Sequence, residues 1–141
     1  MNTHLTPATD LDEERMICAT AMDYMEGWNT ADAQGMERAL HPDLAKRAYL
    51  PGPDGKPRFL HSSALALLQA TRVPKDGNRK AEVRILDRFE GVASVRATMT
   101  EWVDYMHMVK VDGEWKIINI LGEFTPEKWA ARGGIPGERT R

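Results

Sequence analysis

The segment Lys80–Phe124 constrains the fold more than any other, because it reads as a run of antiparallel strands joined by tight turns. Its three parts, KAEVRILDRFEG, VASVRATMTEWVDYMHMVKVDG and EWKIINILGEF, are rich in strand-forming residues. Asp112-Gly113 lies between two apolar-rich runs and is a strong hairpin signal, and Gly91 marks an earlier turn. The middle strand, Val92–Val111, would be about twice the usual length. We therefore expect it to bend or bulge, and the sheet to curl.

Helices from the first half of the chain are expected to cover the concave face of this sheet. The first begins near Asp10, where Glu13 fits a capping box. Its apolar stripe, at helical spacing, contains Ile17, Ala21, Tyr24, Met25 and Trp28. Asp32 can cap a second helix that ends near Leu40–His41, before Pro42, and Ser62 or Ser63 can cap a third. The order predicts an α+β fold, with three N-terminal helices packed on a strongly bent antiparallel sheet.

Length and charge limit the function classes. The 141 residues predict a single domain over residues 1–124, with a loose start at 1–9 and a flexible C-terminal tail at 125–141. The net charge is −2, and Lys and Arg are scattered, so we expect no nucleic-acid partner. Neither a signal peptide nor a membrane-length apolar run is visible, so we expect no membrane partner. Cys18 is the single cysteine, which predicts a cytoplasmic protein without an internal disulfide.

The residues that usually hold metals and cofactors do not cluster in this sequence. None of the histidines, His4, His41, His61 and His107, pairs at metal-ligand spacing. A glycine-rich phosphate loop is missing from the sequence, and Cys18 is expected to pack in a helix. We therefore predict neither a metal nor a cofactor.

Two stretches resemble a known family. They are YMEGWNTADAQGMERALHPDLAKR (24–47) and DYMHMVKVDGEWKIINIL (104–121), and they resemble the putative lumazine-binding family of the nuclear-transport-factor-2-like (NTF2-like) superfamily. The strings LHPDLAKR and DGEWKI carry most of the resemblance, which extends over about Glu14–Phe124. It implies a cystatin-like cone with a pocket inside, and homodimers through the outer face of the sheet. The superfamily includes isomerases, dehydratases, cyclases, epoxide hydrolases and non-enzymatic binding modules, so the fold does not select a function.

The resemblance also implies an orientation for the long strand. Alignment with ketosteroid-isomerase-like relatives places their oxyanion-stabilising acid near His107 and their helix tyrosine at Tyr24. Their catalytic base falls near Tyr49, which is not a base of that kind, so a copied mechanism is not expected. We therefore predict that the His107 face of the strand, which includes Glu101 and Tyr105, lines the pocket. The opposite face would then be outside and would form an apolar dimer patch. That patch consists of Trp102, Met106 and Met108.

Several side chains are candidates for the site. The ligand-binding candidates are Tyr24, Trp28, His41, Tyr49, Tyr105 and His107. Each has a structural alternative, such as a core aromatic at Tyr24, a helix-end contact at His41 or a buried neutral histidine at His107. The catalytic candidates are His107, Glu101 and Glu123, because a carboxylate in an apolar cone has a raised pKa. For both glutamates a solvated strand position is the more common alternative.

Three functions stay open at this point. The first is small-molecule binding in a conical, mostly apolar cavity of a homodimer. The second is a cofactor-free lyase, isomerase or dehydratase that acts on a small aromatic or carbonyl compound by general acid–base chemistry. The third is an interaction module with a filled cavity. An inward carboxylate near His107 would favour the enzyme, a dry apolar cavity would favour binding, and a filled cone would favour the module.

Overall fold

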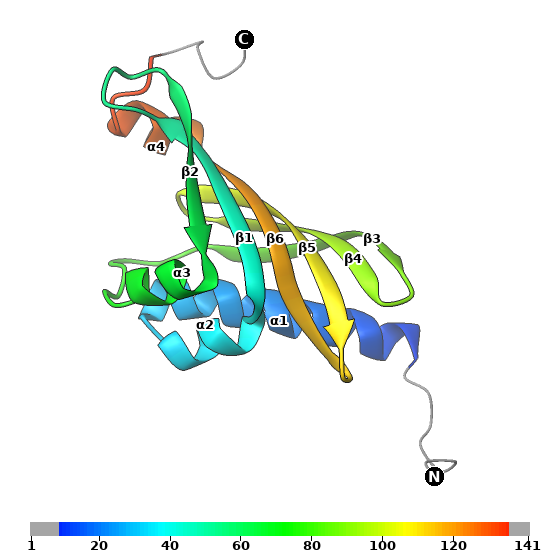
Figure 1. Ribbon diagram of the computed structural model, residues 1–141. Helices are drawn as coiled ribbons and strands as arrows, with labels where there is room; N and C mark the ends of the chain where they lie inside the picture. Colours follow the sequence, from blue (N-terminus) through cyan, green and yellow to red (C-terminus); the bar gives the residue numbers. More distant parts are fainter. Residues whose placement is uncertain (1–8, 136–141) are drawn as a thin grey trace.

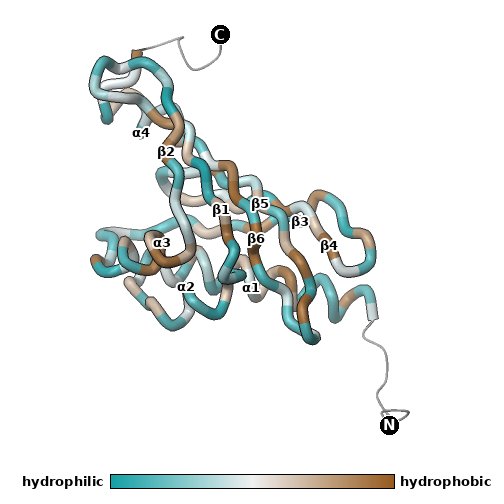
Figure 2. The backbone as a smooth tube through the Cα atoms, viewed as in Figure 1, coloured by the Kyte–Doolittle hydropathy of each residue, from teal (hydrophilic) through white to brown (hydrophobic). Residues whose placement is uncertain are grey.

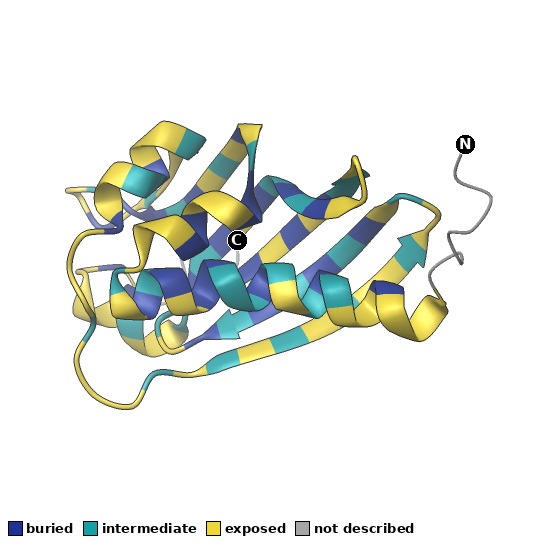
Figure 3. Cartoon of the chain, turned by 90° about the horizontal axis from the view of Figure 1, so that it is seen from below, coloured by how far each residue is buried: buried dark blue, intermediate teal, exposed yellow. Residues whose placement is uncertain are grey.

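A computed structural model of the chain describes residues 9–135. In chain order the elements are α1 (Asp10–Thr30), α2 (Ala33–Ala39), β1 (Leu40–Pro51), β2 (Pro57–Ser63), α3 (Ala64–Ala70), β3 (Ala81–Phe89), β4 (Val92–Met99), β5 (Trp102–Val111), β6 (Glu114–Phe124) and α4 (Pro126–Ala131). The six strands form one curled sheet in the order β2-β1-β6-β5-β4-β3, with α1, α2 and α3 on its concave side (Figure 1). Helix α1 crosses that face from end to end (Figure 3). The predicted α+β class is confirmed.

The helix starts follow from local capping chemistry. Thr9 caps α1 and forms a capping box with Asp12, one residue earlier than the predicted Asp10 and Glu13 pair. Asp32 and Ser63 cap α2 and α3, and both caps agree with the sequence prediction. Because Glu13 is not part of the cap, its carboxylate is available for contacts elsewhere.

The sheet was predicted to be antiparallel throughout, and this prediction is wrong for one pair of strands. Strand β1 pairs with β6 in the parallel direction, and each of the other neighbouring pairs is antiparallel. The prediction of one long strand over Val92–Val111 is wrong, because β4 and β5 pair with each other as an antiparallel hairpin, in which Thr98 lies opposite Val103. Thr100 and Glu101 lie in the turn of this hairpin, so the excess length marked two strands and a chain reversal and not one bent strand.

A bulge in β6 changes which side chains face the helices. The pairing of β5 with β6 shifts between His107 and Met108, so that Ile118 is the extra residue. Trp115 and Ile117 are buried before the bulge. Ile120, Gly122 and Phe124 are buried after it. Glu123 therefore lies on the face opposite to Trp115, although strand parity alone predicts that they share a face.

The predicted orientation of β5 is wrong. Met106 and Met108 are each 1% exposed and belong to the core beneath α1, with Asp104 on the same face and Trp102 packed against it. Hydrophobic residues recur along the central strands β1, β6 and β5 (Figure 2). The reason is energetic, because burial of each methionine contributes about 1.5–3 kcal/mol, whereas a buried His107 would need a partner for each ring nitrogen. Trp102, Met106 and Met108 therefore cannot form an outer dimer patch.

The predicted flexible tail begins with an ordered helix. Thr125 caps α4, and Trp129 is 3% exposed and packs with Ala48, Leu50 and Phe124. Further on, the backbone N–H of Ile135 donates to the carbonyl of Gly55 at 3.0 Å. The prediction of a loose segment is therefore wrong from Pro126 to Ile135, while residues 1–8 and 136–141 lie outside the described part of the chain.

Candidate functional site

Two buried carboxylates, Glu13 and Asp104, are the charged groups of residues 9–135 that the fold removes almost completely from solvent. Burial of a charge is costly unless donors compensate for it, so the partners of each carboxylate indicate its role. We call the two groups of side chains the Asp104 cluster (Tyr24, Lys46 and Asp104) and the Glu13 cluster (Glu13, Lys110 and Trp115).

The Asp104 cluster is a short chain of polar contacts between α1, β1 and β5. The Tyr24 hydroxyl donates to Asp104 Oδ2 at 2.8 Å, and Lys46 Nζ donates to the same hydroxyl at 2.7 Å. Lys46 Nζ also lies 3.9 Å from Asp104 Oδ2, which is an ion pair and not a direct hydrogen bond. Asp104 is 0% exposed, and the Lys46 side chain is 12% exposed. Lys46 is therefore the member of the cluster that reaches the surface.

Strand register brings these residues together. Lys46 pairs with Ile120, and Asp104 pairs with Gly122, so both side chains project from positions next to β6 toward Tyr24. Gly122 is essential to this arrangement, because a Cβ atom there would overlap Asp104 Oδ1. A residue with a side chain would displace the carboxylate, so glycine at this strand position indicates a close approach and not a turn.

The charge states of the cluster follow from its surroundings. Burial, together with the negative charge of Asp104, holds the pKa of the Tyr24 hydroxyl well above its ordinary value, so Tyr24 keeps its proton at neutral pH. Lys46 Nζ lies 5.4 Å from the centroid of the Tyr24 ring and 5.2 Å from that of Trp102. Both distances are within the range of cation–π contacts. A proton donor, a cation and a carboxylate therefore lie in one connected group.

The Asp104 cluster is not fully paired. Asp104 Oδ1 is buried and has no hydrogen-bond partner among residues 9–135. The bond to Tyr24 uses one of the N–H donors of Lys46, and an ammonium carries three donors. Lys46 also lines a hollow of about 280 Å³ beside the β1–β2 pair, together with Leu44, His61 and Ser62. The cluster thus presents an unused acceptor and unused donors, and Lys46 is its member that borders a hollow.

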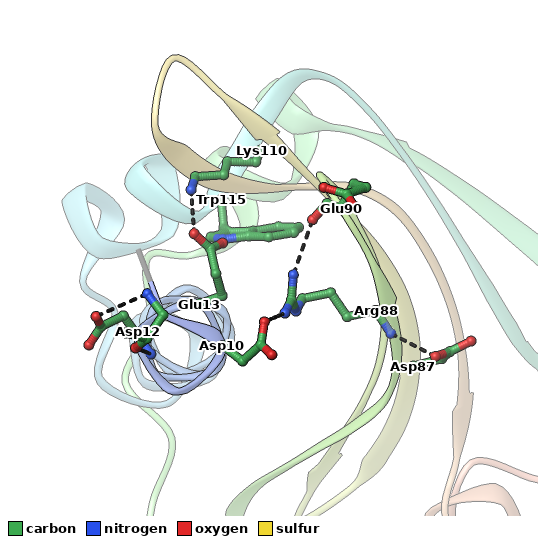
Figure 4. Close-up of polar contacts among 9 residues, drawn as sticks. Asp10, Asp12, Glu13, Asp87, Arg88, Glu90, Lys110 and Trp115 are labelled. Atoms are coloured by element: carbon green, nitrogen blue, oxygen red, sulfur yellow. Dashed lines mark hydrogen bonds and ion pairs between the residues drawn. The ribbon is translucent and has the colours of Figure 1, made fainter. Parts of the chain in front are cut away.

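The Glu13 cluster is complete by comparison. Glu13 Oε2 accepts from Trp115 Nε1 at 2.7 Å, and Oε1 forms an ion pair with Lys110 (Figure 4). The hydrogen bond from Lys110 is the main cause that lowers the pKa of the Glu13 carboxyl, although burial acts to raise it. Nearby, Arg88 pairs with Asp10 (Figure 4). Both oxygens of Glu13 are occupied, so this cluster fastens the start of α1 to the β5–β6 hairpin and is structural.

The predicted pairing of Tyr24 with His107 is wrong. Tyr24 is buried beneath the sheet, whereas His107 and Tyr105 are exposed on the other side. His107 Nδ1 lies 3.2 Å from the Asn119 side-chain amide, which donates to it. The sheet itself therefore separates two residues that were expected to face one cavity.

Three of the candidate residues meet instead in a hollow on the outer face. Tyr49, Tyr105 and Glu123 line a space of about 410 Å³, together with Phe59 and Leu121. The ring centroids of Tyr49 and Phe59 are 5.2 Å apart. This hollow is apolar and aromatic, and it lies on the opposite side of the sheet from Tyr24; Gly122, which makes room for Asp104 Oδ1, also lines it.

The remaining candidates have local structural partners. Lys75 Nζ lies 4.2 Å from the centroid of the Trp28 ring, and His41 Nδ1 accepts from the Asp43 N–H at 3.0 Å. Glu101 forms ion pairs with Lys128 at 2.9 Å and Arg79 at 3.2 Å. The hydrogen bond from Lys128 is the main cause that lowers the pKa of Glu101. The expectation that this carboxylate has a raised pKa, as a general base would, is therefore wrong.

Sequence reasoning missed Lys46, Asp104 and Gly122. Asp104 alternates with Met106 and Met108 on one strand face, and Lys46 lies between Leu44 and Ala48 on another. A charged residue inside an apolar alternation is a signal for a buried polar group, and it was available in the sequence. The partners could not be named from it, because they come from three separate elements.

Within residues 9–135, no group of three or more His, Cys, Asp or Glu side chains is arranged to hold a metal ion. None of the helices described has both the length and the apolar character needed to cross a bilayer.

The sequence is similar to one described family and to a curated relative. The family described as "Putative lumazine-binding" matches residues 12–121. A curated relative, the aldolase FrzH of Cladobotryum sp, is 25% identical over 126 residues, which cover 84% of this chain and 94% of the relative.

Solved structures share the fold. An NTF2-like protein of unknown function from Shewanella baltica superposes with a TM-score of 0.74 and 20% identity, over 85% of this chain and 99% of that one. A protein named putative scytalone dehydratase, from Novosphingobium aromaticivorans, gives a TM-score of 0.59 and 18% identity, over 82% and 86% of the two chains. The family match covers most of the sequence, and the structures agree with it. The chain therefore belongs to the putative lumazine-binding family and has the cystatin-like fold of the NTF2-like superfamily.

Proposed function

We propose that this protein binds a small molecule at the Asp104 cluster, on the concave side of the sheet. The observation that carries the proposal is Asp104 Oδ1, a buried carboxylate oxygen without a donor among residues 9–135. Such a group costs stability unless something supplies a hydrogen bond, and native proteins keep few of them. Membership of a family described as lumazine-binding supports ligand binding in general terms. The ligand would enter beside Lys46, which lines the hollow next to β1 and β2.

Native mass spectrometry, followed by denaturing extraction of any co-purified ligand, tests this proposal. We expect the wild-type protein to carry a small-molecule adduct that Lys46→Met loses. Lys56→Met, which removes an exposed lysine from the β1–β2 turn, is the matched control and should keep the adduct. An adduct that Lys46→Met and Asp104→Asn retain as fully as the wild type would place the ligand elsewhere and contradict the proposal.

A second candidate is acid–base catalysis at the same cluster. The specific observation is the connected chain from Lys46 through the Tyr24 hydroxyl to Asp104, which can polarise a carbonyl and accept a proton in one place. A relative named as an aldolase and a structural neighbour named as a dehydratase are consistent with it. In this reading Lys46 would polarise the substrate carbonyl, Asp104 would take the proton from the adjacent carbon, and Tyr24 would position both groups.

Hydrogen–deuterium exchange into a carbonyl compound separates catalysis from binding. With acetophenone in D₂O, an active cluster should speed deuterium uptake at the methyl group, as measured by NMR. Asp104→Asn should abolish this acceleration, while Asp76→Asn, in an exposed loop, should not change it. If wild-type protein and Asp104→Asn give the same rate, the protein is not an enzyme of this class.

The homodimer remains part of the proposal, with a corrected interface. The outer face of the sheet exposes large apolar side chains around the 410 Å³ hollow, among them Phe59, Tyr105 and Leu121. Apolar patches of this kind on monomers often mark an interaction surface, and a second copy can cover one about a twofold axis. Leu121→Lys should lower the sedimentation coefficient to that of a monomer and leave the far-UV circular dichroism unchanged. A wild-type monomer at tens of micromolar, roughly the range where weak dimers form, would contradict it.

The cytoplasmic location also stays a prediction, supported by the single cysteine, Cys18. An interaction module would be the better description if no small molecule binds on either side of the sheet.

A further inference from the structure

The unpaired atoms of the Asp104 cluster also specify a kind of ligand. We infer that the site takes a neutral compound that carries a hydroxyl group on a carbon next to a carbonyl, or one carbon further away. This inference rests on the proposed function, because it assumes that the Asp104 cluster is the ligand site.

The acceptor half of the site is Asp104 Oδ1. Tyr24 already satisfies the other carboxylate oxygen at 2.8 Å, and Oδ1 lies against the bare backbone of Gly122. Asp104 is 0% exposed, so bulk water does not satisfy this oxygen. A hydrogen bond to a charged acceptor in such surroundings is among the strong ones. A ligand that offers an O–H group would supply the donor that the fold does not.

The donor half of the site is the Lys46 ammonium. Its bond to Tyr24 at 2.7 Å leaves N–H groups that have no acceptor among the described residues. The distance of 3.9 Å to Asp104 Oδ2 is too long for a direct hydrogen bond. Because an ammonium donates and cannot accept, the matching ligand atom is an acceptor such as a carbonyl oxygen.

Charge argues for a neutral ligand. Lys46 and Asp104 carry opposite charges, and together they make the cluster neutral. A carboxylate ligand would bring a second negative charge to Asp104 Oδ1, and an amine ligand would bring a second positive charge to Lys46. Either charge would be unfavourable in this largely buried position, whereas a hydroxy-ketone or hydroxy-aldehyde adds none.

The short distance between the two polar groups of the site, and the aromatic rings around them, further define the ligand. Lys46 Nζ and the Asp104 carboxylate lie within one cluster, so the ligand's donor and acceptor must also be close together. The cation lies over the Trp102 ring, and Trp102 packs on Phe124 with centroids 4.2 Å apart. These rings favour an aromatic or apolar body attached to the hydroxy-carbonyl group. Entry requires the Lys46 side chain to move, and its flexible stem borders the hollow.

Three matched probes test the inference: phenacyl alcohol carries both groups, acetophenone only the carbonyl, and phenethyl alcohol only the hydroxyl. Titrations followed by amide chemical shifts of the full-length protein report both affinity and location. We expect phenacyl alcohol to bind at least about tenfold more tightly than either single-group probe, because a site built to pair a hydroxyl rejects analogues that lack it. The shifts should centre on Tyr24, Lys46 and Asp104, because Gly122 also lines the outer hollow.

Variants assign each half of the preference. Asp104→Asn should reduce the preference for phenacyl alcohol over acetophenone to about onefold to twofold, because a neutral amide is a weaker acceptor. Lys46→Met, at the surface end of the cluster, should weaken both ketones and spare phenethyl alcohol. Lys56→Met is the control and should match the wild type. The amide spectrum of each variant shows whether it is folded. If Asp104→Asn is unfolded, Lys46→Met still tests the inference independently.

The outcomes separate this inference from the proposed function. Equal affinities for the three probes, with shifts centred on the cluster, would overturn the ligand class and leave the ligand site standing. Shifts centred on the outer hollow around Tyr105 and Leu121 would overturn both. The absence of any shift at millimolar probe, together with a native mass spectrum free of adduct, would also overturn both.

Discussion

The two buried carboxylates, Glu13 and Asp104, differ in how completely their oxygens are paired with donors. Glu13 has donors on both oxygens, from Lys110 and Trp115. Asp104 has a donor on one oxygen only, although it is the more deeply buried of the two. Burial alone therefore does not distinguish a structural carboxylate from a candidate functional one. The completeness of its pairing does, because a half-paired carboxylate lowers stability and persists in proteins mainly where it serves another purpose.

The largest effect should come from Gly122→Ala, which tests how tightly the Asp104 carboxylate is confined. The added methyl would overlap Asp104 Oδ1, so we expect a loss of about 3 kcal/mol in the free energy of unfolding. Urea denaturation measures it. Gly91→Ala is the control, because its Cβ would meet Lys110 Cβ at 3.8 Å, an ordinary contact. Removing the carboxylate in the Gly122→Ala/Asp104→Ala double variant should restore part of the loss; strict additivity would show that the overlap is not the cause.

Glu13→Gln should be the next largest change. The amide cannot keep the ion pair with Lys110 and accepts less strongly from Trp115, so we expect a loss of about 2 kcal/mol. Chemical denaturation at neutral pH gives the value. Glu14→Gln, at the exposed neighbouring position, should change stability by less than about 0.5 kcal/mol. Ligand affinity at the Asp104 cluster should be unaffected, and a parallel loss of binding would show that the two clusters are coupled.

The stabilisation from Glu13 should depend on pH in a defined direction. Its pKa is lower in the folded protein than in the unfolded chain, so its contribution is present above the unfolded value, about 4.3. The contribution is lost as the pH falls through the lowered folded pKa. The stability difference between wild type and Glu13→Gln, about 2 kcal/mol at neutral pH, should therefore shrink to roughly half or less at about pH 3. A difference that does not change with pH would show that Glu13 acts through packing alone.

Asp104→Asn should have the smallest effect on stability and the opposite sign. An uncharged amide still accepts from Tyr24 and removes the cost of burying a charge with one unpaired oxygen. We expect a gain of up to about 1 kcal/mol, of the kind seen when a functional group is neutralised. Thermal and urea denaturation measure it. A loss as large as that of Glu13→Gln would mean that Asp104 is a structural carboxylate too.

Local signals in the sequence were sufficient for much of the fold. The caps at Asp32 and Ser63, the Asp112-Gly113 turn and the stripe on α1 each depend on neighbours within a few residues, and each was predicted. The α+β layout followed from their order. The parallel pairing of β1 with β6 was not predicted, because it joins distant parts of the chain and leaves no local pattern.

The site was harder to predict for a related reason. The orientation of β5 was inferred from an alignment that pointed to His107, whereas the inward acid is Asp104, three positions earlier. The three large apolar side chains of the same strand, Trp102, Met106 and Met108, gave the correct face, and the energetics of burial favoured them. In β6 the bulge at Ile118 reversed the assignment of Glu123. A single inserted residue changes every later position, and nothing in the composition of the strand marks it.

The parallel pairing of β1 with β6 has a consequence for how the protein acquires its site. Lys46 lies in the first strand of the chain, whereas Gly122, which makes room for Asp104, lies in the last. Contacts between such distant segments form late, because closing a long loop costs entropy before the contacts that it brings together contribute stability. During synthesis Lys46 must wait for β6 to emerge and insert between β1 and β5. The cluster should therefore be able to bind a ligand only after the final step of folding. Ligand binding would then show that β6 has paired with both β1 and β5.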